Sequence, residues 1–123
     1  MCNVSTYTLP MVLSRDVKKG SAELLILSLL EEGPRHGYEI ARLIADRSEG
    51  TITFTSATLY PALHGLDREG IIRGRWVVKP GERRRRYYHL TASGRRTLQA
   101  HRRGWRRFID ALSLIGLPAR AGR

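Results

Sequence analysis

The side chains with the clearest chemistry are four consecutive arginines, Arg83–Arg86, which follow a Lys-Pro-Gly-Glu segment. Guanidinium and ammonium groups bind phosphate through charge-assisted hydrogen bonds. Because successive side chains of a strand point to opposite faces, the four arginines cannot all contact one phosphate backbone. We expect Arg86 to brace the sheet and the residues nearest the turn to meet a polyanion. These candidate contacts are Lys79, Arg83, Arg84 and Arg85.

A second candidate set lies on a predicted helix over residues 56–69. Leu59, Leu63 and Leu66 recur at four- and three-residue steps, which predicts a buried face. The opposite face carries hydroxyl, imidazole, guanidinium and small apolar groups, which suit the base edges and phosphates of duplex DNA. A face that only meets solvent is the alternative. The candidate residues on this helix are Ser56, Ala57, Thr58, Tyr60, Pro61, His64 and Arg68.

A third candidate set precedes the first apolar run of the chain. Ser21 is the predicted N-cap of a helix that continues through Leu24–Leu30, and Lys18 and Lys19 stand just before it. A helix N-terminus favours phosphate because of its free N–H groups and its dipole. Tyr38, early in the next helix, could donate its hydroxyl to the same backbone. A half-buried aromatic between two helices is the alternative for Tyr38.

These candidates require a particular order of elements. Three helices followed by a basic hairpin are typical of a winged helix-turn-helix. The expected fold class is therefore mainly α with a small β-hairpin: a winged helix-turn-helix plus a long C-terminal dimerisation helix. On the first hairpin strand we expect Ile72, Trp76 and Val78 to share one face. The predicted elements are helices from Ser21 and over 36–47 and 56–69, strands over 71–78 and 84–90, and a helix capped by Thr91 that reaches about Ile115.

The composition fits one compact domain with a polyanionic partner. The chain has 123 residues and a formal net charge of +11, which attracts nucleic acid. A membrane surface is the other anionic partner, but the longest apolar run, Leu24–Leu30, is too short to span a bilayer. The N-terminus does not read as a signal peptide. A single cysteine, Cys2, excludes an internal disulfide and favours a reducing, cytoplasmic location.

The last predicted helix has a different pattern. Leu98, Trp105 and Leu112 recur every seven residues, which is typical of a helix that packs against a partner helix. One helix of a small domain cannot cover such a stripe alone, so we infer a homodimer. A twofold dimer would hold two reading helices roughly 34–36 Å apart on near-palindromic DNA. The candidate interface residues are Leu98, His101, Trp105, Phe108, Ile109, Leu112 and Ile115.

No group of residues offers catalytic or metal chemistry. The four histidines are scattered, and no cysteine or carboxylate pair has metal-ligand spacing. Cys2 has no evident base beside it, and the segment 70–74 lacks the third glycine of a phosphate cradle. We therefore expect a protein that is not an enzyme and that holds no metal and no cofactor.

Five segments of the chain have a recognisable order and spacing: Leu24–Leu27, Gly33–Ile40, Ala57–His64, Glu69–Ile72 and Arg84–Thr91. They resemble the PadR family of bacterial transcriptional regulators, in its short form with a single C-terminal helix. The likeness covers about residues 18–112. It implies a homodimer joined by C-terminal helices with help from an N-terminal helix. It also implies repression, relieved in several members by a small phenolic or planar hydrophobic molecule.

The resemblance makes the interface residues a candidate effector site as well. Trp105 falls where some members place a tryptophan that stacks on such a ligand; an aromatic that only packs the interface is the alternative. The helix is more basic than the mixed charge pattern of the family. This excess of positive charge could suit an anionic effector or reflect an Arg-rich organism. The arginines responsible are Arg95, Arg96, Arg102, Arg103, Arg106 and Arg107.

The prediction is a cytoplasmic, nucleoid-associated DNA-binding repressor without a membrane partner. Two rivals stay open: a basic winged-helix protein that binds RNA or the ribosome, and an adaptor that uses the fold for protein contacts. The expected organisation is an N-terminal arm or helix that contributes to the dimer (1–17), a DNA-binding domain (18–91), a dimerisation helix (92–117) and a flexible tail (118–123).

Overall fold

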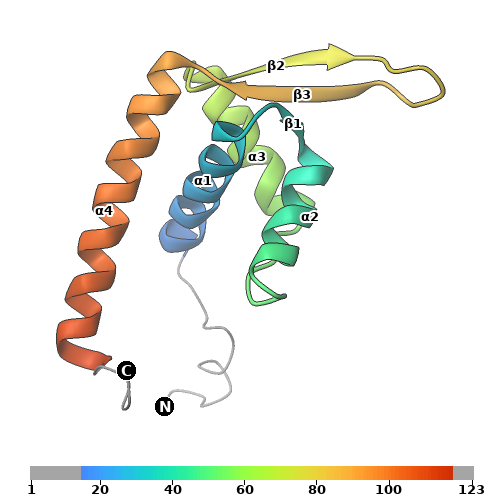
Figure 1. Cartoon of the computed structure of the whole chain (residues 1–123). Helices are drawn as coiled ribbons and strands as arrows, with labels where there is room; N and C mark the ends of the chain where they lie inside the picture. The colour runs from blue at the N-terminus through green and yellow to red at the C-terminus, as the bar shows by residue number, and fades with distance from the viewer. Residues whose placement is uncertain (1–14, 118–123) are drawn as a thin grey trace.

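A computed structural model of the chain describes residues 15–117. The expectations for residues 1–14, for Cys2 and for the tail 118–123 lie outside the described residues. The mainly α class with a small hairpin and a long last helix is confirmed (Figure 1). The elements in chain order are α1 (Arg15–Glu31), β1 (Arg35–His36), α2 (Gly37–Arg47), α3 (Ser56–Arg68), β2 (Ile72–Val77), β3 (Arg85–Leu90) and α4 (Ala92–Gly116).

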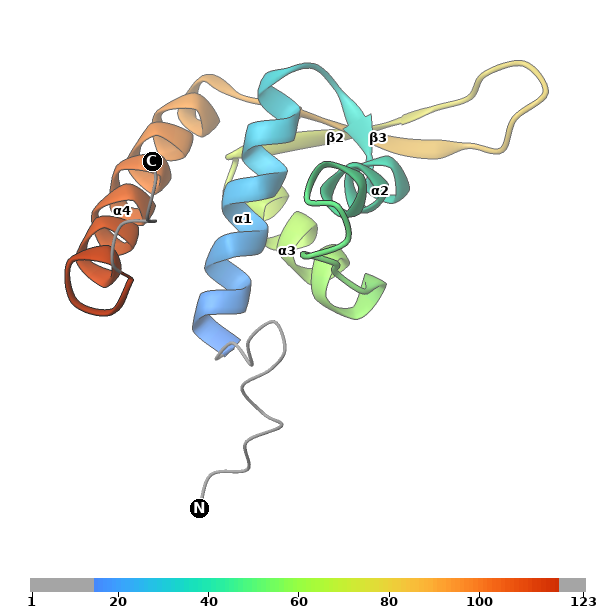
Figure 2. The ribbon, with the colours of Figure 1, turned by 60° about the horizontal axis from the view of Figure 1, so that its bottom comes forward.

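Helix α1 forms the middle of the molecule, with α2 and α3 on one side and α4 on the other (Figure 2). Its side chains Ile26 and Leu27 are completely buried among those of the neighbouring helices. Leu98 of α4 belongs to the same core and is also completely buried. The expectation that Leu98 contributes to a dimer interface is therefore wrong, because α1 already covers this part of the stripe.

Helix α1 begins earlier than its sequence indicates. The predicted start at Ser21 is wrong, since the helix begins at Arg15 and the Ser21 hydroxyl donates to the Lys18 carbonyl, 3.0 Å away, inside the helix. The expected domain boundary at residue 18 consequently falls within α1. Gly20 lies against α4: a Cβ there would lie 3.6 Å from the Trp105 ring, an ordinary van der Waals contact.

The end of α1 is fastened to α2 by one carboxylate. Glu32 accepts from both terminal nitrogens of Arg47, at 2.7 and 2.9 Å, and from Arg35 at 2.8 Å. These hydrogen bonds, those of Arg47 above all, lower the pKa of Glu32 to about 2. The carboxylate therefore stays ionised at neutral pH, and the two helices keep their mutual position.

The sheet is antiparallel with the strand order β1-β3-β2, and its first strand was not predicted. Strand β1 has only two residues, paired with Tyr87 and Tyr88 of β3, so it carries no alternating pattern that a sequence could reveal. The predicted Pro-Gly turn is confirmed: Gly81 has a φ of +77°, and the Glu82 amide donates to the Lys79 carbonyl at 3.0 Å. Positive φ at this position is the conformation that favours glycine.

The hairpin of β2 and β3 extends away from the helices as a wing (Figures 1 and 2). Ile72 is fully buried at the base of the wing, whereas Trp76 is 54% and Val78 67% exposed. The face expected for these three residues is therefore covered only at its base, because the far part of the hairpin has no helix beneath it.

Helix α4 starts where the sequence predicts. The Thr91 hydroxyl oxygen accepts from the Gly94 amide at 2.9 Å, as an N-cap does. The same hydroxyl lies within hydrogen-bond distance of the Gly70 and Ile71 carbonyls, so the cap also ties α4 to the turn after α3. Arg102 then links α4 to α1, since its guanidinium lies 2.9 Å from Glu31 Oε1. None of the helices within residues 15–117 combines the length and apolar character needed to cross a membrane.

Candidate nucleic-acid interface

The outer face of α3 is exposed as its sequence predicts. Leu59, Leu63 and Leu66 are buried against α1 and α2 and fix the helix by one side. Thr58 is half-buried. The other candidate residues of this helix are exposed: Ser56, Ala57, Tyr60, Pro61, His64 and Arg68. Their hydroxyl, imidazole and guanidinium groups are thus available to a partner, while Thr55, which precedes the helix, makes no side-chain cap.

A groove of about 670 Å³ separates α1 from α3, and the two lysines of the third candidate set lie on its wall. Lys18 and Lys19 face Ala57, Thr58 and Pro61 across this groove. They do so from inside α1, so the expectation that they stand at a helix N-terminus is wrong. They offer side-chain ammonium groups and not free backbone N–H groups. The hydroxyl of Ser21, already bonded within α1, is not part of this groove.

The cations of the wing divide into one that binds a helix and others that are open to a partner. Arg86 points back to the helices and donates to Asp67 of α3 at 3.0 Å, which confirms its bracing role. The hydrogen bond from Arg86 to Asp67 raises the pKa of this guanidinium. Lys79, Arg83 and Arg84 are exposed, and Arg85 is half-buried.

Two aromatic side chains hold the cations of the wing in place, and sequence reasoning assigned neither of them this role. The Arg84 guanidinium lies 4.3 Å from the centroid of the Trp76 ring, and the Lys79 ammonium 5.0 Å from that of Tyr87. Cation–π contacts of this kind orient a positive group without neutralising it. A tryptophan near the end of a strand that leads into a basic turn was the available signal in the sequence.

A notch of about 240 Å³ lies between the wing and the start of α2, and Tyr60 brings α3 into it. A Cβ on Gly37 would come within 2.9 Å of the Tyr60 ring and hydroxyl, so only glycine leaves room for this aromatic side chain. The neighbouring residue Pro61 faces the α1–α3 groove instead. Helix α3 therefore joins the notch and the groove into one surface. The notch is lined by His36, Gly37, Tyr60, Trp76, Arg83, Arg84, Arg85, Arg86 and Tyr88.

His36 is the N-cap of α2, a role that its sequence does not indicate. Its Nδ1 accepts from the Glu39 amide at 3.3 Å, and its ring meets the Tyr87 ring edge to face at 5.2 Å between centroids. Desolvation lowers the pKa of His36, and the nearby charge of Arg85 lowers it further. Tyr38, two residues further along, is 63% exposed and so is not the half-buried aromatic of the alternative.

Acidification is expected to weaken the fold through His36. Because Nδ1 is the acceptor, protonation would put a hydrogen on it and add a positive charge beside Arg85, and the cap would lose its acceptor. Because the pKa of His36 is lower in the folded chain than the ordinary 6.5, the unfolded chain takes up the proton first. The contribution of the His36 cap to the free energy of unfolding should be complete well above pH 6.5 and should be lost, at a cost of about 1 kcal/mol, as the pH falls through the folded pKa.

Urea unfolding between about pH 5 and 8 measures this effect. The control is His36→Asn, which caps a helix without titrating. The difference in stability between wild type and variant should shrink or reverse at low pH. Parallel pH profiles of the two proteins would rule out the cap as the titrating element.

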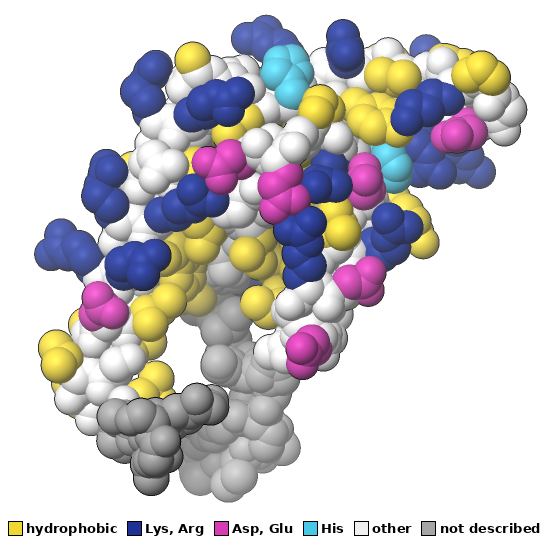
Figure 3. Space-filling model, viewed as in Figure 1, with side chains coloured by type: hydrophobic (Ala, Val, Ile, Leu, Met, Phe, Trp, Pro, Cys, Tyr) yellow, Lys and Arg dark blue, Asp and Glu magenta, His cyan; other side chains and the backbone are white. Residues whose placement is uncertain are grey.

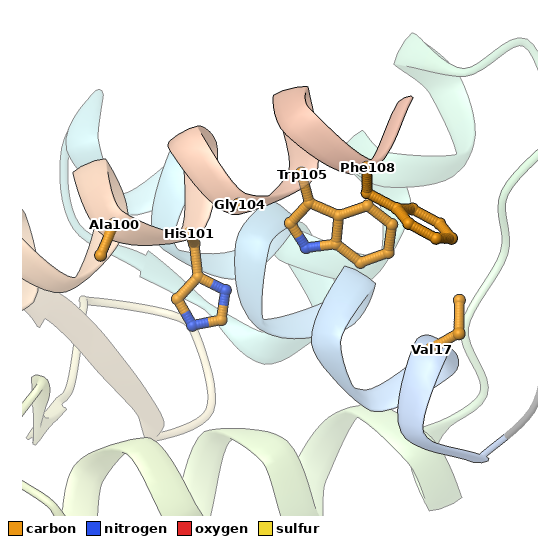
Figure 4. Close-up of a pocket in the computed structure, with 6 residues that line it drawn as sticks. All are labelled: Val17, Ala100, His101, Gly104, Trp105 and Phe108. Atoms are coloured by element: carbon orange, nitrogen blue, oxygen red, sulfur yellow. The ribbon is translucent and has the colours of Figure 1, made fainter. Parts of the chain in front are cut away.

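A further pocket, of about 510 Å³, lies between α1 and α4 (Figure 4). Trp105, Phe108 and His101 point from α4 toward α1, and the Trp105 and Phe108 rings meet edge to face at 5.9 Å. The His101 Nε2 lies 3.8 Å from Glu23 Oε1 at one margin. The remaining lining residues are Val17, Ala100 and Gly104. The walls are therefore apolar and aromatic, with one imidazole.

Apolar side chains continue from this pocket along the last turns of α4, where they are exposed (Figure 3). Ile109 is 52%, Leu112 46% and Ile115 92% exposed. A folded protein rarely leaves neighbouring large apolar side chains uncovered unless they form a binding surface.

Three helices, an exposed basic wing and a polar outer face on the third helix define a winged helix-turn-helix of the DNA-binding class. Residues 26–100 match the transcriptional regulator PadR-like family. The chain belongs to this family.

Solved structures of similar proteins support this assignment. A transcriptional regulator from Clostridium thermocellum is 30% identical, with a TM-score of 0.76, over 85% of this chain and 99% of that one. A PadR family regulator from Clostridium difficile R20291 is 30% identical, with a TM-score of 0.66, over 76% of this chain and 95% of that one. The structure of Bacillus subtilis PadR in complex with operator DNA is 28% identical, with a TM-score of 0.58, over 63% of this chain and 44% of that one.

A curated relative is similar over a shorter part. The transcriptional regulator YqjI of Escherichia coli K12 is 28% identical over 83 residues, which are 68% of this chain and 38% of that protein. The winged helix-turn-helix class expected from the sequence is thereby confirmed.

Proposed function

We propose that this chain is a homodimeric transcriptional repressor that binds near-palindromic duplex DNA through α3 and the wing. The observation that carries the proposal is the continuous surface along α3. Tyr60 of this helix lines the arginine-rich notch, and the side of the helix from Ala57 to Arg68 lines the groove that holds Lys18 and Lys19. A B-DNA major groove admits a helix whose flanks carry cations for the two phosphate backbones.

The residues divide by the chemistry of their contact. Thr58 and His64 have small or planar polar groups that can reach base edges and so read sequence. Lys79, Arg83 and Arg84 lie on the wing and act on the phosphate backbone, which carries no sequence information. The two lysines of the α1–α3 groove would bind the phosphates on the other side of α3. Arg85 supports the notch from a half-buried position.

Dimerisation is proposed through the second half of α4. Ile109, Leu112 and Ile115 are exposed in the isolated chain, whereas Leu98 is excluded because it lies in the core. A second copy of the chain would bury this stripe and set the spacing of two α3 helices. The start of α1 and the segment before it are proposed to join this interface.

We further propose that the α1–α4 pocket receives a small planar hydrophobic or phenolic effector. Trp105 and Phe108 supply aromatic faces and edges, and the His101 imidazole is the polar group nearest to them. A ligand here would contact the interface and α1 together, and α1 also packs on α3. Release from DNA then requires that the ligand bind one arrangement of the dimer more tightly than the other.

The proposed function is tested by the salt dependence of DNA binding. The probe is a duplex enriched by the protein itself from a random-sequence pool. If six to ten phosphates are contacted, affinity should fall about 10³-fold or more between about 50 and 200 mM salt, because counterions are released. A flat response would contradict phosphate binding. Equal affinity for RNA would favour the RNA-binding rival, and no duplex binding at low salt would favour the adaptor.

Matched variants separate the two kinds of contact in the same titration. Lys79→Gln and Arg83→Gln should weaken enriched and random duplexes equally and reduce the salt slope by about one each. Thr58→Ala and His64→Ala should instead cost about 1–3 kcal/mol on the enriched sequence and little on random DNA.

A further inference from the structure

Helix α4 carries a row of arginines on the face that points away from α1. With 3.6 residues per turn, five arginines fall within an arc of about 120°, and between the first and the last of them Gln99 is the one other residue on this arc. All five are exposed, and Figure 3 displays basic side chains along the outer edge of α4. We call this surface the outer arginine strip: Arg95, Arg96, Arg103, Arg106 and Arg107.

The strip is not neutralised within residues 15–117, where none of its members forms an ion pair. Arg102, on the side of the same helix that faces α1, does bind a carboxylate, that of Glu31. Like charges three and four residues apart on a helix repel each other and reduce its stability by a few tenths of a kcal/mol. Asp110, on the same arc one turn beyond Arg106, forms no ion pair with the strip, so an external anion would relieve this repulsion.

The position of the strip separates it from the proposed reading surface. Leu98, His101 and Trp105 turn the opposite face of α4 toward α1, and α1 stands between α4 and α3 (Figure 2). The strip also lies on the side opposite Leu112, so a dimer joined by the apolar stripe leaves it uncovered. A straight duplex seated on α3 and the wing therefore does not reach it.

We propose that the outer arginine strip binds the phosphate backbone of a second segment of duplex DNA, so that the dimer joins two duplexes. The inference rests on the proposed function, which supplies the first duplex. From Arg95 to Arg107 the strip extends about 18 Å, the length of about five base pairs. Its contacts should be independent of sequence, since the phosphate backbone carries no sequence information.

The composition of the strip favours nucleic acid over a protein partner. Protein interfaces depend on a core of apolar and aromatic anchors surrounded by polar residues. Between Arg95 and Arg107 the strip has no such anchor, only guanidinium groups and the amide of Gln99. A uniformly charged surface provides what a polyanion requires and nothing that a folded protein would recognise.

The test loads the dimer with an unlabelled enriched duplex of about 24 base pairs, long enough for two half-sites. A fluorescent duplex of unrelated sequence is then added, and its binding is followed by anisotropy and by co-sedimentation. The wild type should bind both duplexes. In the variant R95Q/R96Q/R103Q/R106Q/R107Q, affinity for the second duplex should fall about tenfold or more, while affinity for the first changes less than about threefold.

Two controls make the result specific. The matched variant with lysine at the same five positions keeps the charge and should retain the second duplex. Circular dichroism should be unchanged in both variants, because Gln and Lys are good helix formers. Second-duplex binding that survives in the glutamine variant, or that the loaded wild type lacks, overturns the inference and leaves the proposed function intact.

Two other results would contradict more than the behaviour of the variants. If the loaded wild type binds polyglutamate or single-stranded RNA more tightly than the duplex, the assignment of the strip to DNA is wrong. If the first duplex does not bind at all, both the proposed function and the inference fall.

Discussion

A chain that carries Ile109→Glu and Leu112→Glu is expected to be a monomer whose affinity for operator DNA is at least about 100-fold weaker than that of the wild type. Both side chains are about half exposed on the stripe that is proposed to meet a second copy. A carboxylate buried in an apolar interface without a partner costs several kcal/mol, so the interface should not form. Two linked heads gain about 10²–10⁴ in affinity from effective concentration, and a monomer loses this gain.

The matched control is Leu114→Glu. Leu114 is 87% exposed and points about 160° away from Leu112 on the helix, so the same change there should leave the dimer intact. Sedimentation equilibrium gives the oligomeric state, and titration of a labelled operator gives the affinity. A wild type that is monomeric at micromolar concentration, or a double variant that still dimerises, would refute the proposed interface.

The second large effect is expected at Gly94, where alanine should destabilise the chain by about 3 kcal/mol. A Cβ at this position would collide with the Ile71 carbonyl oxygen and lie 2.8 Å from Leu90 Cδ1. The obstacle is backbone and cannot rotate away. The same carbonyl accepts from the Thr91 amide at 3.2 Å and lies 2.9 Å from its hydroxyl, so any shift also disturbs the cap of α4.

Gly65→Ala provides the comparison in another helix. Its Cβ would meet only the far end of Arg68, at 4.0 Å, so this variant should gain about 0.5–1 kcal/mol from the loss of glycine flexibility. Chemical denaturation of both variants measures the difference. Equal stabilities would mean that the start of α4 is not tightly packed on the turn after α3.

Local signals in the sequence were sufficient for several elements of the site. The leucine stripe of α3 specifies which of its sides is buried, and by exclusion which side carries Ser56, His64 and Arg68 outward. Gly81 and Pro80 determine the turn of the wing, because each restricts or permits a backbone angle on its own. Strand alternation likewise placed Arg86, which braces Asp67, on the opposite face from Arg85. In each case the cause lies within a few residues of the chain.

Only the tertiary structure decided which partner covers each apolar residue. Leu98, Trp105 and Leu112 repeat every seven residues, yet Leu98 lies in the core of the chain, Trp105 packs beside Gly20 and Leu112 is exposed. The periodicity indicates that the helix has an apolar face. It does not indicate how far along that face the neighbouring helix extends.

The same limit applies to the surface proposed to bind DNA. No local pattern encodes contacts between segments that are far apart in the sequence. Such contacts determine strand β1, the surroundings of the His36 cap and the packing of Tyr60 against Gly37. Sequence by itself determined the reading helix, the wing and its charges. Packing decided where α1 begins, which lysines face α3, and that the arginines of α4 point away from the rest of the site, because burial is a property of the assembled layers and not of any one element.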